Sequence, residues 1–329
     1  MQNKLSKATL GKLLLVLVTI VWGSSFVILK DTLSTLGDGH FTFFILASRF
    51  IIASVLLVAI CWKKFITISK STFLKGLILG FILFGAYSVQ TIGLRYTSAS
   101  KNAFLTSVYV VLVPFLSWLF LKKKPTFKNY LATALCFVGI AFVAVIGKKD
   151  SASNEILGDI LSIASGIFYA LQIIFISKHT EKEDAMQLLI VELLTVAVLC
   201  SIISLSTEFS LHASKFSMSG EAIWKLLYLA FICTLFAQFG QMVAQKYAPP
   251  MSVALIFSLE SVFGVVFELL LGDANLTVFI IIGFVFIFIG EIVSEVDLKQ
   301  LLNPIFKRKN ESKIQENHTN DEIKNKENS

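Results

Sequence analysis

The chain has 329 residues, of which 55% are hydrophobic and only 16% are charged. Because soluble domains carry about 25% charged residues, this composition excludes a soluble globular fold and indicates an all-α polytopic membrane protein. The formal net charge of +7 requires no nucleic-acid partner, since lysine and arginine also mark the cytoplasmic loops of membrane proteins.

Ten segments are apolar and long enough for a helix to cross a bilayer. They lie near residues 11–30, 41–62, 73–93, 99–121, 129–147, 157–177, 186–206, 222–245, 251–271 and 275–296. The first follows lysines, as in a signal peptide, but it is too long for one and we expect it to be retained. Pro114 in the fourth segment cannot donate a hydrogen bond, so we expect that helix to bend there. Residues 299–329 are polar and of mixed charge, which predicts a disordered tail.

The positive charges predict the orientation of the chain. With the N-terminus in the cytoplasm, 21 of the 29 lysines and arginines fall in cytoplasmic segments and 7 in outer segments, while Arg49 lies inside a span. Cytoplasmic loops carry the excess of positive charge, so both termini are predicted to be cytoplasmic. The lysine-rich composition and the tail rich in Asn, Lys and Glu are compatible with an AT-rich bacterial genome, which predicts the bacterial cytoplasmic membrane.

The features of the first five spans recur, in the same order, in the last five. The stretch IGLRYTSAS ends the third span and VAQKYAPPM ends the eighth, which pairs Tyr96 with Tyr247. Because five is an odd number, the second copy must enter the membrane from the opposite side. This predicts two inverted five-helix repeats, residues 1–150 and 151–298, a plan of secondary transporters whose binding site lies between the halves.

Hydrogen-bonding side chains follow one face of several spans. In the fourth span Asn102, Thr106 and Tyr109 lie at spacings of four and three, which places them in one stripe. Such groups are costly in hydrocarbon unless they find partners or water. We therefore expect a shared cavity lined by spans one, three, four, six, eight and nine, with direct hydrogen bonding between helices as the alternative. The candidate substrate-binding residues are Trp22, Ser25, Tyr87, Gln90, Asn102, Thr106, Tyr109, Tyr169, Gln172, Gln238 and Gln241.

Few charged residues lie inside the spans. Glu260 is near the middle of the ninth span, Glu192 is in the seventh and Arg49 is in the second. A carboxylate at membrane depth is a functional candidate, as a proton carrier or as a partner for a substrate cation. A structural ion pair with Arg49 is the alternative. We assign these three residues to proton coupling or gating, whereas Glu268 and Glu291 lie nearer span ends, where they can reach lipid headgroups.

The sequence contains no pattern for a cofactor, a metal or a catalytic group. Its four cysteines occur singly in or beside apolar spans, with no CxxC and no Cys/His cluster. There is no GxxxxGK[ST] motif, so we do not expect direct coupling to ATP. We expect no enzyme, although an integral-membrane lipid-modifying enzyme remains a less favoured alternative.

Several stretches resemble one family of carriers. WGSSFVILK in the first span, SRF in the second, RYTSASKNAFLTSVYVVLVP around the fourth and LESVFGVVFELLLGD in the ninth resemble the EamA-type carriers of the drug/metabolite transporter superfamily. The resemblance covers about residues 10–297 and implies a ten-helix inverted-repeat carrier that exports amino acids or other small metabolites. The chain departs from the family at Glu260-Ser261, where members often have Glu-Pro, and at LKKKPT after the fourth span, where members often have a glutamate whose second-half counterpart here is Asp273.

These patterns predict a secondary active transporter that exports a small neutral or zwitterionic metabolite, such as an amino acid, by alternating access. Phosphate recognition uses clustered lysine or arginine, whereas Arg49 is the only cation deep inside the spans. A phosphorylated-metabolite or nucleotide-sugar antiporter is therefore the less favoured alternative. The expected partners are the metabolite, the lipid bilayer and protons as a coupling ion. The oligomeric state stays open.

Overall fold

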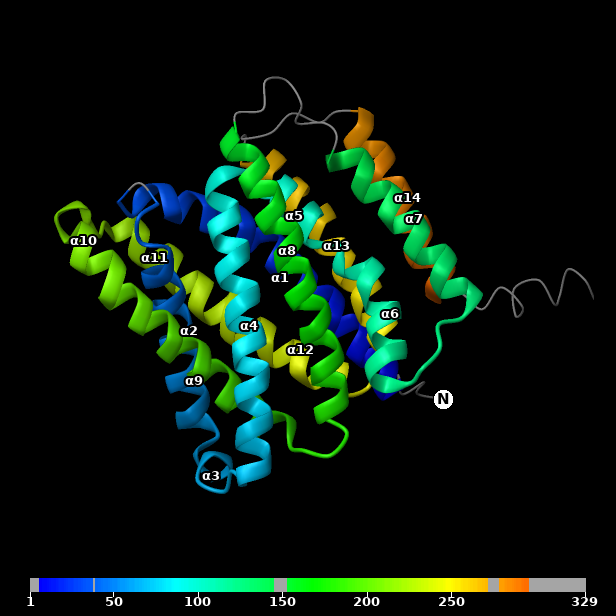
Figure 1. Cartoon of the computed structure of the whole chain (residues 1–329), viewed down its shortest axis with the longest axis horizontal. Coiled ribbons are helices and arrows are strands. Elements are labelled where there is room, and N and C mark those ends of the chain that lie inside the picture. The colour runs from blue at the N-terminus through cyan, green and yellow to red at the C-terminus, as the bar shows by residue number, and fades with distance from the viewer. Residues whose placement is uncertain (1–5, 38, 145–152, 272–277, 296–329) are drawn as a thin grey trace, which may run out of the picture.

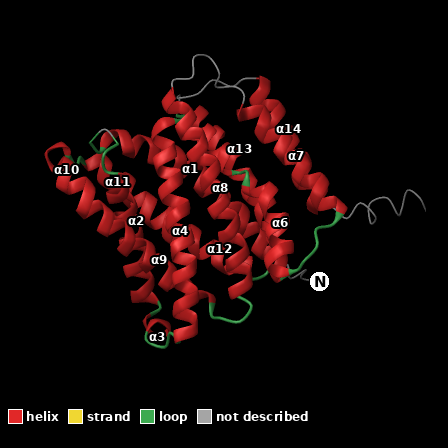
Figure 2. Cartoon of the chain, in the orientation of Figure 1, coloured by secondary structure: helices red, strands yellow, loops and turns green. Residues whose placement is uncertain are grey.

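The computed structural model describes residues 6–37, 39–144, 153–271 and 278–295, and its regular elements in this part of the chain are all helices (Figures 1 and 2). The longer elements are α1 (Lys7–Thr35), α2 (Thr42–Ile60), α4 (Lys70–Tyr96), α5 (Ala99–Thr106), α6 (Tyr109–Leu121), α7 (Phe127–Ala144), α8 (Ser153–His179), α9 (Ala185–Ile203), α11 (Gly220–Tyr228), α12 (Ala237–Gln245), α13 (Pro250–Leu270) and α14 (Val278–Glu295). Short elements are α3 (Trp62–Phe65), α10 (Ser210–His212), a 3₁₀ turn at Ala213–Lys215 and π-helical segments at Ser204–Phe209 and Leu229–Phe236.

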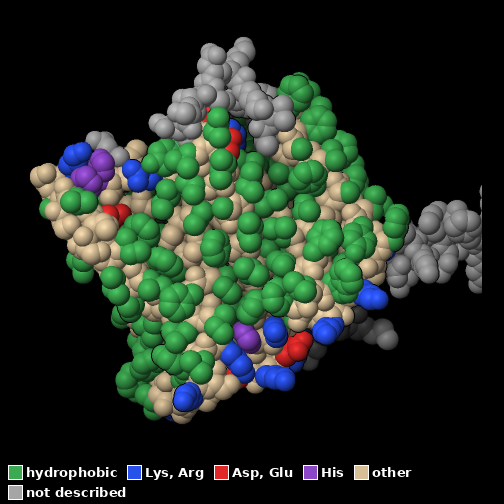
Figure 3. Space-filling model, viewed as in Figure 1, with side chains coloured by type: hydrophobic (Ala, Val, Ile, Leu, Met, Phe, Trp, Pro, Cys, Tyr) green, Lys and Arg blue, Asp and Glu red, His purple; other side chains and the backbone are tan. Residues whose placement is uncertain are grey.

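The helices support the predicted multi-pass architecture. In the described part of the chain, eight helical segments are long and apolar enough to cross a membrane, and shorter apolar helices at Phe127–Phe142 and Ile281–Gly290 lie where the fifth and tenth spans are expected. Hydrophobic side chains cover the face seen in Figure 3, and charged side chains gather near its edges. The all-α membrane fold is thus confirmed. The chain termini, the tail, the boundary between the predicted repeats and Asp273 lie outside the described residues, so their predictions stay predictions.

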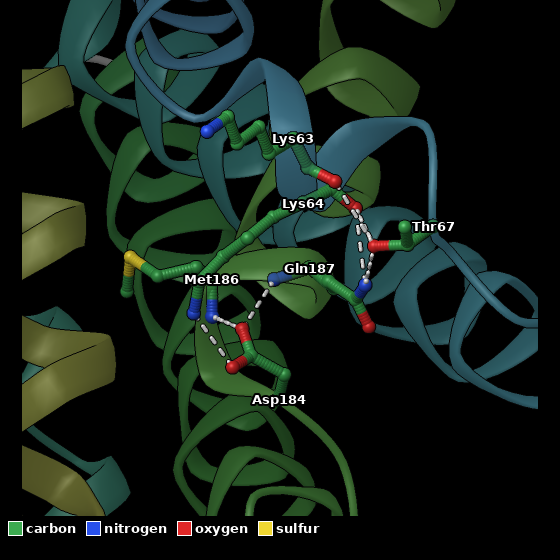
Figure 4. A network of polar contacts seen from close by, with 6 residues as sticks. All are labelled: Lys63, Lys64, Thr67, Asp184, Met186 and Gln187. Carbon is green, nitrogen blue, oxygen red and sulfur yellow. Dashed lines mark hydrogen bonds and ion pairs between the residues drawn. The ribbon is translucent and has the colours of Figure 1, made fainter.

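Short polar side chains begin several helices by accepting hydrogen bonds from backbone N–H groups that have no partner within the helix. Ser69 accepts from the N–H of Thr72 at 3.1 Å. Asp184 accepts from the N–H groups of Met186 and Gln187 at the start of α9, and its other oxygen accepts from Lys64 (Figure 4). Apolar residues then continue each helix, so the caps set where the spans begin.

The two halves pack through pairs of helices that correspond when the halves are exchanged. The first span (α1) packs on the ninth (α13), and the sixth (α8) packs on the fourth (α5 and α6). The third span (α4) packs on α8, and α12 of the eighth span packs on α1. The fifth and tenth spans, α7 and α14, lie against each other at one side of the molecule (Figure 1). The predicted two-fold relation between repeats fits this pairing, whereas the opposite insertion of the two copies stays a prediction.

Small residues allow α1 and α13 to approach closely. A Cβ atom added to Gly23 would lie 2.5 Å from the Cβ of Phe263 and 2.9 Å from the backbone nitrogen of Gly264. The two helices are therefore in backbone contact at this point. This contact sets the first span directly against the helix that carries Glu260.

The fourth span is interrupted earlier than the sequence indicated. Pro114 lies inside α6 without ending it, and the interruption between α5 and α6 is at Ser107 and Val108. There the hydroxyl of Ser107 donates to the carbonyl of Ala103 at 3.0 Å, and backbone bonds shorten to the i+3 pattern. A Cβ atom on Gly166 of α8 would lie 2.5 Å from the carbonyl oxygen of Thr106. The break thus lies at a close contact with α8. The residue pattern within one helix does not reveal a contact of this kind.

Two glutamates near the ends of second-half spans cap first-half helices. Glu208, in the π-helical segment Ser204–Phe209, accepts from the N–H groups of Phe43 and Phe44 at 2.7 and 2.8 Å. Glu268 accepts from the N–H of Ser100 at 3.1 Å and is only 6% exposed, so the expectation that it reaches headgroups is wrong. A negative charge is favourable at a helix N-terminus, which explains both positions. The side chain of Glu291 lies outside the described residues.

Candidate functional site

A cavity lies where the two halves meet. It is small, about 20 Å³, which is room for about one water molecule. Its lining is Trp22, Ser25, Phe26, Leu29, Arg49, Tyr87, Gln90, Leu94, Tyr109, Tyr169, Ile173, Gln241, Phe257 and Glu260. These residues come from spans one, two, three, four, six, eight and nine, so the second span joins the six that the stripes indicated.

The structure brings together nine of the fourteen candidate residues at this cavity. Those nine are Trp22, Ser25, Arg49, Tyr87, Gln90, Tyr109, Tyr169, Gln241 and Glu260. The other five do not line it. They are Asn102, Thr106, Gln172, Gln238 and Glu192. The stripes therefore locate the centre of the protein, but part of each stripe faces a neighbouring helix instead of the cavity.

Three of the non-lining residues hydrogen-bond side chains or backbone groups that belong to the lining. Gln238 donates to the hydroxyl of Tyr87 at 3.1 Å. Asn102 donates to the carbonyl of Gln90 at 3.2 Å, and the side-chain amide of Gln90 donates weakly to Thr106 at 3.4 Å. The alternative of hydrogen bonding between helices thus applies to these positions. Each one positions a residue that does face the cavity.

The same network crosses the boundary between the halves. Tyr169 of α8 donates from its hydroxyl to Gln90 of α4 at 2.8 Å. Asn102 of α5 donates to Ser162 of α8 at 2.7 Å, and the hydroxyls of Thr106 and Ser165 lie 3.1 Å apart. Because one side chain of each pair belongs to each half, a rocking motion of the halves would have to rearrange these bonds.

Arg49 is a buried cation at the wall of the cavity. It is only 1% exposed. Its Nε donates to the hydroxyl of Thr234 at 2.9 Å, and its guanidinium carbon lies 5.3 Å from the centre of the Tyr87 ring. Both Nη atoms are buried and have no hydrogen-bond partner among the described residues. Buried donors without partners are costly, so these two groups are suited to receive an anionic oxygen from a ligand.

A π-helical segment places the residue that holds Arg49. Thr234 lies within Leu229–Phe236 and donates to the carbonyl of Leu229, five residues earlier, at 2.8 Å. π-bulges in helices occur frequently at functional sites. Thr234 lies four residues before Gln238, on the polar face of the eighth span, but nothing in the hydrophobic pattern indicates this irregularity or the contact of Thr234 with Arg49.

Glu260 shares the cavity with Arg49 but is not bonded to it. Both side chains line the space, and no ion pair joins them in the part of the chain that the structure describes. The structural ion pair considered for these two residues is therefore absent from this conformation. The cavity wall therefore contains an acidic and a basic side chain that are not paired with each other.

The apolar part of the lining was not predicted. Phe26, Leu29, Leu94, Ile173 and Phe257 complete the cavity wall. Apolar residues in an apolar span carry no signal that separates a cavity wall from a lipid-facing surface, so only their position in the fold identifies them.

Trp22 has a fixed orientation in the wall. Its indole Nε1–H donates to the carbonyl of Cys233 at 3.1 Å, and its ring meets that of Phe257 edge-on, with centroids 5.1 Å apart. Cys233 belongs to the same π-helical segment that carries Thr234. The segment thus positions two parts of the lining, the Trp22 indole and the Arg49 guanidinium.

Glu192 and Gln172 form a separate buried pair. The side-chain amide of Gln172 in α8 donates to the carboxylate of Glu192 in α9, and neither residue lines the cavity. Glu192 is completely buried and Gln172 is 1% exposed. Their place between two helices of the second half fits a packing role. Within the described ranges, no group of three His, Cys, Asp or Glu side chains could hold a metal ion.

Comparison with known proteins agrees with this architecture. A model of the EamA-like transporter family matches the chain twice, over residues 9–145 and 156–294. An uncharacterized transporter of Archaeoglobus fulgidus is 30% identical over 255 residues, which cover 77% of this chain and 75% of the relative. A second uncharacterized transporter of that organism is 27% identical over 261 residues, covering 78% and 86%.

The fold also matches a solved crystal structure of a protein, with a TM-score of 0.71 at 13% sequence identity, over 88% of this chain and 98% of the other. The two matches of the family model fall on the two predicted repeats. Together with the apolar helices, they identify a multi-pass protein of the cell membrane. The chain belongs to the EamA-like transporter family.

Proposed function

We propose that the protein is a secondary active transporter, and not an enzyme, that exports a small neutral or zwitterionic metabolite such as an amino acid. One observation carries the proposal. The central cavity contains both the unpartnered Nη groups of Arg49 and the carboxylate of Glu260, with no ion pair between them. A zwitterion can satisfy both, with its carboxylate on Arg49 and its ammonium on Glu260.

The size of the cavity supports transport by alternating access. At about 20 Å³ the space is too small for an amino acid. The halves must therefore separate on one side before a solute can enter, and again on the other side before it can leave. The predicted inverted repeats supply two alternative openings about a fixed central site.

Counterflow in proteoliposomes tests the proposal. Vesicles preloaded with one unlabelled amino acid at a time are diluted into the same labelled compound, and uptake beyond equilibrium identifies a substrate. For a substrate found in this way, Arg49→Gln should lower uptake by roughly tenfold or more, because it removes one charge-assisted contact. Uptake that is the same in preloaded and in empty vesicles for every compound tested would contradict the proposal.

An anionic solute is the alternative that the free guanidinium leaves open. A sugar phosphate or nucleotide sugar would use Arg49 but would be repelled by Glu260. In the same assay, Glu260→Gln should then increase uptake of the phosphorylated solute, whereas it should reduce uptake of a zwitterion. The sign of this one change separates the two substrate classes.

We also propose that Glu260 couples transport to protons, because it faces the cavity where a solute would bind. Glu260→Gln should abolish the response of transport to a pH gradient. Glu192→Gln is the matched control, since it removes a buried carboxylate that does not line the cavity. Normal pH-driven transport by Glu260→Gln would refute this role, and a loss confined to Glu192→Gln would move it to that residue.

A further inference from the structure

A second pocket, separate from the central cavity, lies at one side of the molecule, where α4 begins and where α6 and α8 end. It has a volume of about 400 Å³ and is lined by Lys75, Phe120, Leu121, Lys123, Lys178, His179, Glu181 and Lys182. Near the lower edge of the face seen in Figure 3, a histidine side chain lies among basic side chains. The predicted orientation places this edge at the cytoplasmic surface of the membrane.

The charge of the pocket is only partly neutralised. Lys75 is paired with Glu183, and Lys123 lies 3.7 Å from Glu181. Lys178 and Lys182, the other two lysines of the lining, form no ion pair with any described residue. Two cations therefore converge on the pocket without a carboxylate of their own.

His179 is a further polar residue of the pocket lining. Its Nε2 is buried and has no hydrogen-bond partner among the described residues, while its ring packs against Phe175 with centroids 5.7 Å apart. The ammonium of Lys178 lies 5.9 Å from the Phe120 ring centre and 5.7 Å from that of Phe175. These contacts with aromatic rings hold the side chains of Lys178 and His179 in place. Lysines that serve only as general surface charge do not need such contacts.

We propose that this pocket binds a phosphate-bearing anion, and that its source is the headgroup of an anionic phospholipid. Lysines and a histidine supply several donors for phosphate oxygens. Phe120 and Leu121, at the end of an apolar helix, supply the apolar border that a lipid needs. Basic pockets between membrane helices on the cytoplasmic side are a known setting for such headgroups.

The position of the pocket predicts that a bound anion affects the conformation of the protein. Lys75 and Lys123 belong to the first half, whereas Lys178 and Lys182 belong to the second. An anion bound between them attracts both halves at one end of the cavity. Bound lipid should therefore favour the conformation in which the two halves are closed at this end.

Lipid binding to the purified full-length protein tests the proposal. The protein in detergent is titrated with short-chain phosphatidylglycerol, with phosphatidylcholine of the same chain length and with glycerol 3-phosphate, and bound ligand is counted by native mass spectrometry. Lys178→Gln with Lys182→Gln should weaken phosphatidylglycerol binding by roughly tenfold or more. The matched control, Lys63→Gln with Lys246→Gln, removes two exposed lysines outside the pocket and should leave binding unchanged.

A third variant distinguishes a specific binding site from a general effect of surface charge. His179→Leu keeps the number of lysines but removes the buried Nε2, and it should also weaken binding. Equal affinities for phosphatidylglycerol and phosphatidylcholine, or equal losses in the pocket and control variants, would overturn the proposal. Binding of glycerol 3-phosphate as tight as that of the lipid would support the phosphate site and assign it to a soluble anion. Unfolding midpoints without ligand verify that each variant is folded.

Discussion

Thr234 holds Arg49 in place from within the π-helical segment Leu229–Phe236. Thr234→Val removes the hydroxyl and nearly preserves the shape, so the Nε of Arg49 becomes a further buried donor without a partner. We expect a loss of stability of about 1–3 kcal/mol and lower transport. Unfolding in detergent measures the first effect and counterflow the second.

The control for this change is Thr32→Val. Thr32 is also completely buried, but its hydroxyl donates only to the carbonyl of Ile28 in its own helix, at 2.6 Å. This variant should keep its transport activity. Equal effects of the two substitutions would mean that the hydroxyl at position 234 has no particular role in holding Arg49.

Two polar residues show what the spacing within a helix predicts and what it does not predict. Spacing predicts both Tyr87 and Gln238 as cavity residues, yet Tyr87 lines the cavity whereas Gln238 donates a hydrogen bond to the Tyr87 hydroxyl. A polar group in a membrane is satisfied equally well by a cavity or by a neighbouring helix. Spacing within one helix therefore predicts the polar face but not what that face meets.

At the scale of elements, the loop between α8 and α9 ties the halves together. Its acidic residues Glu181, Glu183 and Asp184 pair with Lys123, Lys75 and Lys64, respectively. Lys64 lies in α3, Lys75 lies in α4 and Lys123 lies in the loop after α6, and Figure 4 shows the pair of Asp184. The Glu183–Lys75 pair is the least exposed of the three, and we expect it to contribute most to closing this end of the protein.

Glu183 should give that loop a pH-dependent stability. Hydrogen bonds from Lys75, Thr72 and Ser71 lower the pKa of Glu183 from 4.5 to about 2. Because the folded pKa is the lower one, the ionised group stabilises the fold above about pH 4.5, and this contribution is lost as the pH falls toward 2. Glu183→Gln should cost about 1 kcal/mol at neutral pH, and its difference from the natural protein should shrink below about pH 4.5.

Thermal unfolding at a series of pH values measures this effect. Glu181→Gln is the control, because Glu181 and Lys123 are 3.7 Å apart and both more than half exposed. Exposed pairs contribute little, so this variant should match the natural protein at every pH. A constant difference between Glu183→Gln and the natural protein down to acid pH would contradict the assignment.

Close packing of α1 on α13 makes Gly23 sensitive to substitution. In Gly23→Ala the new methyl group would meet the Cβ of Phe263 at 2.5 Å and backbone atoms at 2.9 Å, so the helices must shift apart. Overpacking of this kind typically costs about 1–3 kcal/mol. Gly220→Ala should be tolerated, because nothing lies within 4 Å of its added Cβ. Equal unfolding midpoints for the two variants would show that the contact is not tight.

At the scale of the whole molecule, the distribution of lysines predicts which surface faces the cytoplasm. In a variant without its own cysteines, Lys215→Cys should react with an impermeant thiol reagent in intact cells. Lys63→Cys should react only after the membrane is permeabilised, because the positive-inside rule places its lysine-rich segment in the cytoplasm. The opposite labelling pattern would reverse the orientation and, with it, the side assigned to the lipid pocket.

The sequence by itself determined the membrane setting, the helical class, the order of the apolar segments and the family. The reason is that the length and apolarity of a spanning helix are local properties that the bilayer imposes on the chain. A repeated order of features is likewise visible along a single chain. For the site, local patterns also identified Glu260, Arg49, Trp22 and the three tyrosines of the cavity as candidates.

Only the tertiary structure decided how those candidates are used. It separates Arg49 from Glu260, brings the second span into the lining, and places the interruption of the fourth span at Ser107 instead of Pro114. It also gathers Lys178 and His179 with lysines of the first half into one pocket. Each outcome depends on contacts between helices far apart in the chain, and the periodicity of a single helix carries no information about which neighbour it meets.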